Sequence, residues 1–94
     1  MDARYRREDV EAEVRPVFDQ LVAEFGPACE VWTRVENFGL WLSAGVVDPA
    51  RRSHAEVEVR RGRSTRTALL GTREIGRIRE HLSAGDDRPL RIGL

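Results

Sequence analysis

The strongest constraint on the fold is an alternation of side-chain character with period two over residues 29–36. Cys29, Val31, Thr33 and Val35 alternate with Glu30, Trp32, Arg34 and Glu36. Because successive side chains of a strand point to opposite faces, this pattern predicts a β-strand. A turn at 37–39 and a second strand over 40–47 follow, so the segment predicts an antiparallel hairpin.

Further strands are predicted downstream of this hairpin. Asp48-Pro49 breaks the second strand, and residues 54–61 alternate again, with Ala55, Val57 and Val59 on one side. Gly62 permits a turn into a more polar strand over 64–70. Residues 90–94 alternate in a short last segment, which we expect to be an edge strand or a docked tail.

Helical periodicity flanks the strands. Apolar residues recur at steps of three and four over residues 10–25, where Asp9 can cap the start. Pro16 either kinks this helix or marks its true beginning, and Gly26-Pro27 ends it, with glycine suited to a left-handed cap. A second helix is predicted from Thr72, as its N-cap, to Gly85.

Together these elements predict an α+β fold with two layers. Two amphipathic helices cover one face of a four- to five-stranded antiparallel sheet, in the order α-β-β-β-β-α-(β). Ninety-four residues are the size of a single domain, 1–94, with residues 1–7 expected to form a frayed N-terminal segment.

Composition indicates the compartment and the kind of organism that the chain comes from. No apolar run is long enough for a transmembrane helix, so no membrane association is expected. The single cysteine, Cys29, excludes an internal disulfide, and without a secretory signal this favours the cytoplasm. All 16 basic residues are arginine, which is typical of GC-rich coding sequences such as those of actinobacteria or their phages.

The hairpin can pair in two registers, and the apolar pattern distinguishes them. A two-residue loop at Phe38-Gly39 places Val35 opposite Leu42, Thr33 opposite Ala44 and Val31 opposite Val46. That register makes one face continuously apolar, whereas a slip of one residue mixes both faces. Since the helices need an apolar face to cover, we predict the first register.

This register places Trp32 and Trp41 together on the other, charged face. Exposed indoles forgo a few kcal/mol of burial, at ~25 cal/mol per Å². Either the segment 90–94 or a second copy of the chain covers them, or they form a partner-binding patch. The third alternative is a different register, in which one tryptophan belongs to the core. The candidate partner-binding residues are Trp32, Trp41, Arg34, Glu36 and Arg60.

No catalytic, metal or cofactor site is expected. Cys29 should point to the helix-covered face as inert packing, and His81 fits the negative end of a helix dipole. His54 and His81 have no third ligand at a fitting spacing. We therefore predict a protein that is not an enzyme.

Two alternatives to protein binding stay open. Residues 1–50 carry a net charge of −5 and residues 51–94 a net charge of +5. Nucleic-acid binding would use the arginines of the third and fourth strands and the second helix, namely Arg52, Arg61, Arg63, Arg66, Arg73 and Arg77. The other alternative is a structural domain that only self-associates as a homodimer.

Overall fold

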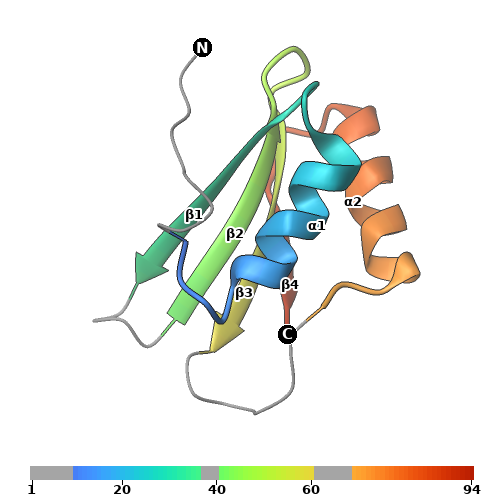
Figure 1. Ribbon diagram of the computed structural model, residues 1–94. Helices are drawn as coiled ribbons and strands as arrows, with labels where there is room; N and C mark the ends of the chain where they lie inside the picture. The colour runs from blue at the N-terminus through green and yellow to red at the C-terminus, as the bar shows by residue number, and fades with distance from the viewer. Residues whose placement is uncertain (1–9, 37–40, 61–68) are drawn as a thin grey trace.

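The computed structural model describes residues 10–36, 41–60 and 69–94, apart from the side chain of Arg60. The fold belongs to the predicted α+β class (Figure 1). Its elements are α1 (Arg15–Phe25), β1 (Glu30–Glu36), β2 (Trp41–Asp48), β3 (Ser53–Arg60), α2 (Thr72–Ala84) and β4 (Leu90–Gly93).

The four described strands form one mixed sheet in the order β1-β2-β3-β4. The first three strands are antiparallel neighbours, but β4 pairs parallel to β3, so the prediction of a purely antiparallel sheet is wrong. The reason is the helix between these two strands: α2 returns the chain to the starting end of β3, and the next strand then runs in the same direction. Most of the strand predicted over 64–70 lies outside the described residues, and Leu69 and Leu70 are not in a strand.

The predicted hairpin register is confirmed. Val35 lies opposite Leu42, Thr33 opposite Ala44 and Val31 opposite Val46. The pairing of β2 with β3 continues the apolar face, since Val59, Val57 and Ala55 lie opposite Leu42, Ala44 and Val46.

Helix α1 begins at Arg15, with Pro16 in its first turn, so Pro16 marks the start of the helix and does not kink it. Before it, the N–H groups of Val14 and Arg15 donate to the carbonyl oxygen of Glu11 in a turn. Asp9, the predicted cap, lies outside the described residues. At the other end Gly26 is extended (φ −74°, ψ 150°), so the predicted left-handed cap is wrong there.

Helix α2 is capped differently from the prediction at its start and as predicted at its end. Gly71, and not Thr72, is the N-cap, because the Glu74 carboxylate reaches back and accepts the Gly71 N–H at 2.9 Å. Gly85 ends the helix in the left-handed region (φ 68°), where glycine carries no steric penalty.

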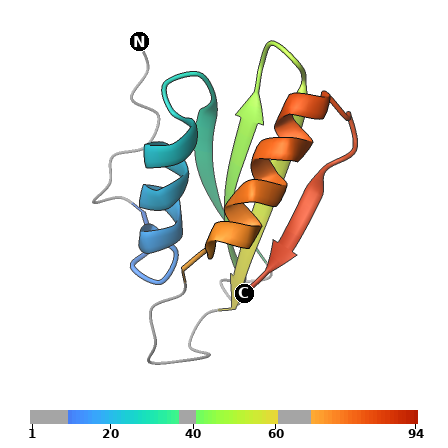
Figure 2. The same cartoon turned by 90° about the vertical axis from the view of Figure 1, so that its right-hand side faces the viewer.

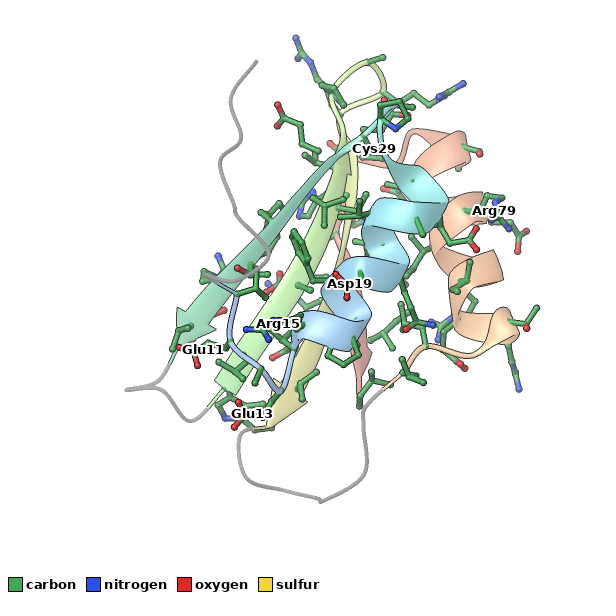
Figure 3. All side chains as sticks on the ribbon, viewed as in Figure 1. Glu11, Glu13, Arg15, Asp19, Cys29 and Arg79 are labelled. Carbon is green, nitrogen blue, oxygen red and sulfur yellow. The ribbon has the colours of Figure 1, made fainter. Side chains whose placement is uncertain are left out.

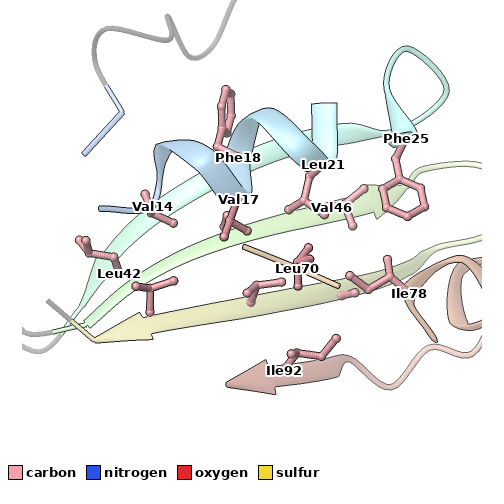
Figure 4. Close-up of a cluster of buried hydrophobic side chains, with 14 of the residues drawn as sticks. Val14, Val17, Phe18, Leu21, Phe25, Leu42, Val46, Leu70, Ile78 and Ile92 are labelled. Atoms are coloured by element: carbon pink, nitrogen blue, oxygen red, sulfur yellow. The ribbon is translucent and has the colours of Figure 1, made fainter. Parts of the chain in front are cut away.

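Both helices lie on the same side of the sheet (Figures 1 and 2). Helix α1 packs on β1 and β2, and α2 packs on β3 and β4. Figure 4 shows the buried cluster between the layers, in which Leu21, Leu42 and Ile78 are each 0% exposed. Complete burial of such a side chain contributes roughly 1.5–3 kcal/mol.

Two polar contacts hold the ends of α2 in this core. The Gln20 side chain of α1 donates to the Leu70 carbonyl at 2.9 Å and accepts the Leu70 N–H at 2.7 Å. The buried Ser53 hydroxyl donates at 2.8 Å to the Leu82 carbonyl in the last turn of the helix, a carbonyl that also accepts the Gly85 N–H at 3.3 Å. Gln20 therefore ties α1 to the segment before α2, and Ser53 ties the end of α2 to β3.

The position of the last strand shows that residues 90–93 do not cover the tryptophans, so this predicted cover is wrong. Residues 90–93 form β4 at the edge of the sheet beside β3, and Ile92 is buried in the helix-covered core. The segment is thus an edge strand, one of the two predicted forms, and it does not lie over the opposite face.

Candidate functional site

The side of the sheet away from both described helices is called here the open face. The strand register assigns to it one alternate set of residues from each strand. They are Glu30, Trp32, Arg34 and Glu36 on β1, Trp41, Ser43, Gly45 and Val47 on β2, His54, Glu56, Glu58 and Arg60 on β3, and Arg91 and Gly93 on β4.

Trp32 lies flat on the open face because its neighbour on β2 is a glycine. Gly45 is the residue opposite Trp32, and a Cβ atom at Gly45 would stand 2.0 Å from the Trp32 ring. A glycine inside a strand commonly marks such a close approach. The indole is half-buried as a result, so part of the burial that we expected from a partner comes from the chain itself.

Arg34 closes over the same indole. Its guanidinium carbon stands 5.1 Å from the centroid of the Trp32 ring, within the range of a cation–π contact. Its Nη2 donates to a Glu56 carboxylate oxygen at 2.7 Å, and its Nε donates to Glu36 at 2.8 Å. Arg34 thereby links β1 to β3 across β2.

The ion pair between Arg34 and Glu56 is unequal in exposure. The Arg34 side chain is 51% exposed, whereas that of Glu56 is only 7% exposed. Burial lowers the pKa of Arg34, but the charges and hydrogen bonds of Glu56 and Glu36 raise the pKa above its ordinary value, so the guanidinium stays cationic. The Glu56 carboxylate is therefore buried, whereas the Arg34 guanidinium that pairs with it is in contact with solvent.

Ser43 lies in the middle of the open face, between Arg34 on β1 and Glu58 on β3. The residue is 0% exposed, and its hydroxyl oxygen is buried without a hydrogen-bond partner. A buried hydroxyl without a partner costs free energy of order 1–3 kcal/mol. The hydroxyl of Ser43 is therefore shielded from water although the residue lies on the open face.

Trp41 shares the open face with Trp32 but does not lie next to it. Trp41 is opposite Glu36 and Arg60, whereas Trp32 is opposite Gly45, four positions further along β2. At about 3.3 Å per residue the two positions are roughly 13 Å apart along the sheet. Both indoles are half-buried, with the row containing Arg34 and Ser43 between them.

Among the five predicted partner-binding residues, the structure brings Trp32, Arg34 and Glu36 into one contact network and places Trp41 opposite Glu36. Arg60 is opposite Trp41 in the register. Sequence reasoning places Ser43 and Glu56 on this face without a role, and it missed Gly45. Only Gly45 carried a usable signal, because a glycine inside a predicted strand opposite a tryptophan indicates an aromatic ring lying on the backbone.

The arginines of the nucleic-acid alternative do not form one patch in the part of the chain that is described. Arg73 and Arg77 are exposed on α2, and Arg73 lies in its first turn. Arg52 lies in the turn before β3, and the next residue, Ser53, donates to the Leu82 carbonyl near the end of α2. Leu82 is roughly 14 Å from Arg73 along the helix, at 1.5 Å per residue. Arg61, Arg63 and Arg66 lie outside the described residues.

The described residues offer little for nucleophilic or metal chemistry. Cys29 lies where α1 leads into β1 (Figure 3), and burial together with the charge of Asp48 raises the pKa of its thiol, although Arg51 opposes this shift. A raised pKa leaves less of the reactive thiolate. The His81 ring contacts the Arg88 carbonyl at 2.7 Å, and no group of three or more His, Cys, Asp or Glu side chains over residues 10–36, 41–60 and 69–94 could hold a metal ion.

No protein-family model matches the chain, and neither the curated proteins nor the solved structures gave a match. Neither α1 nor α2 is long and apolar enough to span a bilayer, as judged over the described part of the chain.

Proposed function

We propose that this domain is a non-enzymatic protein-interaction module that binds one protein partner through its open face. Trp41, Trp32 and Arg34 would make the central contacts, with Glu36 and Arg60 at their side. The observation that supports the proposal is the position of both indoles and of Arg34 on the side of the sheet opposite α1 and α2.

The chemistry of these side chains fits protein recognition. Tryptophan and arginine are enriched among the residues that dominate binding energy, because each combines a large contact area with a directional polar group. Arg34 is already held by Glu36, Glu56 and the Trp32 ring, so little side-chain freedom remains to be lost on binding. The face therefore offers a pre-organised contact surface.

The setting of the proposal comes from composition. A lysine-free chain fits a GC-rich source such as an actinobacterium or one of its phages. In that setting the domain would act in the cytoplasm as a modulator of a single host protein.

The test is capture that depends on the open face. A photo-crosslinking amino acid at Val47, on the open face, should capture one protein, which is then purified for affinity measurement. Trp41→Ser should weaken its binding by about 30-fold, the loss expected for a residue worth ~2 kcal/mol. Val22→Ser is the matched control, because Val22 is 44% exposed on α1 and should leave the affinity unchanged.

Two results would contradict the proposal. One is an affinity that Trp41→Ser and Arg34→Gln both leave at the parental value while circular dichroism shows the parental fold. The other is equal capture from the crosslinker at Val47 and at Val22.

Nucleic-acid binding has less support, because Arg52 is far from Arg73 on the folded chain. It predicts affinity that falls steeply with salt and with Arg61→Glu and Arg63→Glu. The absence of a gel shift at low ionic strength would remove this alternative.

A further inference from the structure

The two indoles of the open face lie along one strand of the sheet. Trp41 belongs to β2, and the ring of Trp32 reaches from β1 over Gly45 of β2. The open-face residue between these two positions is Ser43, which is small and buried. The distance along β2 is roughly 13 Å, so about four residues of an extended chain are long enough to contact both rings.

The polar groups that remain unbonded along this line are hydrogen-bond donors. Arginine has five N–H groups, and Arg34 uses Nε for Glu36 and Nη2 for Glu56. Its Nη1 donates to no described residue, although the side chain is 51% exposed. Neither indole N–H donates to a residue in the described part of the chain. The line therefore offers aromatic rings and donors that need acceptors.

The charges around Arg34 disfavour an acidic ligand. Glu36 and Glu56 both bond to Arg34, so these three side chains together carry one net negative charge. Glu58, the next open-face residue of β3, adds a carboxylate, and Arg91, opposite Glu56 on β4, adds a guanidinium. A carboxylate or phosphate brought to Nη1 meets this excess of negative charge, whereas a neutral carbonyl oxygen does not.

We propose that the open face binds a proline-rich segment of its partner in the polyproline II conformation. Such a segment is rich in carbonyl acceptors and poor in N–H donors, and it is known to dock on aromatic surfaces. Its rings pack on Trp41 and on the exposed part of Trp32, and one carbonyl accepts from Nη1 of Arg34. This inference rests on the proposed function and adds the chemistry of the partner.

The first test compares four synthetic ten-residue peptides as probes of the full chain. One is proline-rich and uncharged, two carry a single glutamate or a single lysine at the same central position, and one consists of glycine and serine. Binding is followed by the NMR signals of the two indole N–H groups up to about 5 mM peptide, which detects a Kd near 1 mM.

The uncharged proline-rich peptide should shift both indole signals. The glutamate peptide should bind at least about threefold more weakly than the lysine peptide, because the two interrupt the proline sequence equally and differ in charge. The glycine-serine peptide should bind at least about tenfold more weakly than the proline-rich peptide, because it must lose more chain entropy on binding.

Variants then test the location. Trp41→Ser should weaken binding of the proline-rich peptide by about tenfold, as expected for an aromatic contact. Arg34→Lys keeps a cation beside Glu56 but removes the planar donors, and it should weaken binding by about threefold or more. Val22→Ser, on exposed α1 surface, is the control and should leave the affinity unchanged. Circular dichroism of each variant checks the fold.

Several results would overturn the proposal. One is the absence of any indole shift with the proline-rich peptide up to about 5 mM. Tighter binding of the glutamate peptide would indicate an acidic ligand, and equal binding of the glycine-serine peptide would remove the preference for polyproline II. An affinity that Trp41→Ser leaves at the parental value would remove the location.

Competition separates this inference from the proposed function. Excess proline-rich peptide should reduce the capture of the partner by the crosslinker at Val47. Capture that depends on Trp41 but persists in excess peptide would overturn the proline-rich ligand and leave the proposed function intact.

Discussion

The two faces of the sheet are built from the same strands but are held by different forces. On the helix-covered face Leu42, Ala44 and Val46 of β2 are each 0% exposed within the core. On the open face Trp32 is held between the backbone of Gly45 and the guanidinium of Arg34, with Glu56 buried beside them. The helix-covered face is stabilised by close packing of apolar side chains. The arrangement of the open face depends on the absence of a side chain at Gly45 and on the ion pairs of Arg34.

Neighbouring residues of one strand can thus contribute very differently to the free energy of unfolding. Leu42 and Ser43 are adjacent in β2 and both 0% exposed, yet Leu42 fills the core and Ser43 buries a hydroxyl without a partner. Substitutions in this one strand can therefore separate the two faces.

The largest effect is expected on the helix-covered face. Leu42→Ala should lower the free energy of unfolding by roughly 3–5 kcal/mol, because it removes buried methyl groups and leaves a cavity in the core. Urea denaturation followed by circular dichroism measures this loss. A loss below about 1 kcal/mol would mean that the site collapses without cost or is not core.

Gly45→Val should have the largest effect on the open face. The new Cβ would stand 2.0 Å from the Trp32 ring, so the indole must leave the sheet. Overpacking of this kind costs about 1–3 kcal/mol, and the tryptophan fluorescence should shift to the red as the ring becomes hydrated. In a Trp32→Ala background the same substitution should cost little, and an equal cost in both backgrounds would contradict the stacking.

Glu56→Gln should have an intermediate effect. It keeps the shape of the buried side chain but removes the charge that Arg34 faces, and we expect a loss of about 1–2 kcal/mol in the free energy of unfolding. Because the Arg34 side chain is 51% exposed and keeps Glu36, the loss should be smaller than for a fully buried pair. Glu58→Gln, on the same face of β3, is the control and should change stability little.

A small effect of opposite sign is expected at Ser43. Ser43→Ala removes a buried hydroxyl that has no partner and should leave the free energy of unfolding unchanged or raise it by up to about 1 kcal/mol. Comparison with Leu42→Ala in the same denaturation experiment gives the contrast between the faces. A loss of 2 kcal/mol or more, about the cost of removing a satisfied buried hydrogen bond, would contradict an unsatisfied hydroxyl.

The smallest effect concerns Asp48, the one charged side chain on the helix-covered side of the described strands. A side-chain hydrogen bond from Arg51 lowers the pKa of Asp48 most, backbone N–H groups of Arg51 and Ala50 lower it further, and burial opposes them. With a folded pKa below the unfolded value, this stabilisation is present above the unfolded pKa and is lost as the pH falls through the folded pKa. Asp48→Asn should therefore flatten the acid limb of stability against pH, and an unchanged limb would contradict this linkage.

The alternation of apolar and polar residues was sufficient to predict the parts of the fold that depend on which side chains of a strand face the helices. The pairing of Val35 with Leu42 followed from the requirement for one apolar face, since a single-residue slip would bury charge under the helices. The direction of β4 did not follow, because alternation of Leu90 and Ile92 gives a strand its faces but not its neighbour or its orientation.

The candidate site was predictable only in part for a related reason. Alternation and register placed Trp32 and Trp41 on one face, but the stacking of Trp32 on Gly45 depends on a contact that alternation does not specify. The start of α2 shows a similar limit: Thr72 has the better capping side chain, yet Glu74 satisfies the Gly71 N–H and moves the cap by one residue. Contacts between side chains decided these details, and local propensity did not.

The central claim is that both indoles lie on the sheet face opposite the helices. Nuclear Overhauser contacts of the two indole rings in a labelled sample test it most directly. We predict contacts from the Trp32 ring to the Gly45 α-protons and the Arg34 side chain. Contacts from either indole to the methyl groups of Leu21 on α1 or Ile78 on α2, both buried in the core, would contradict it.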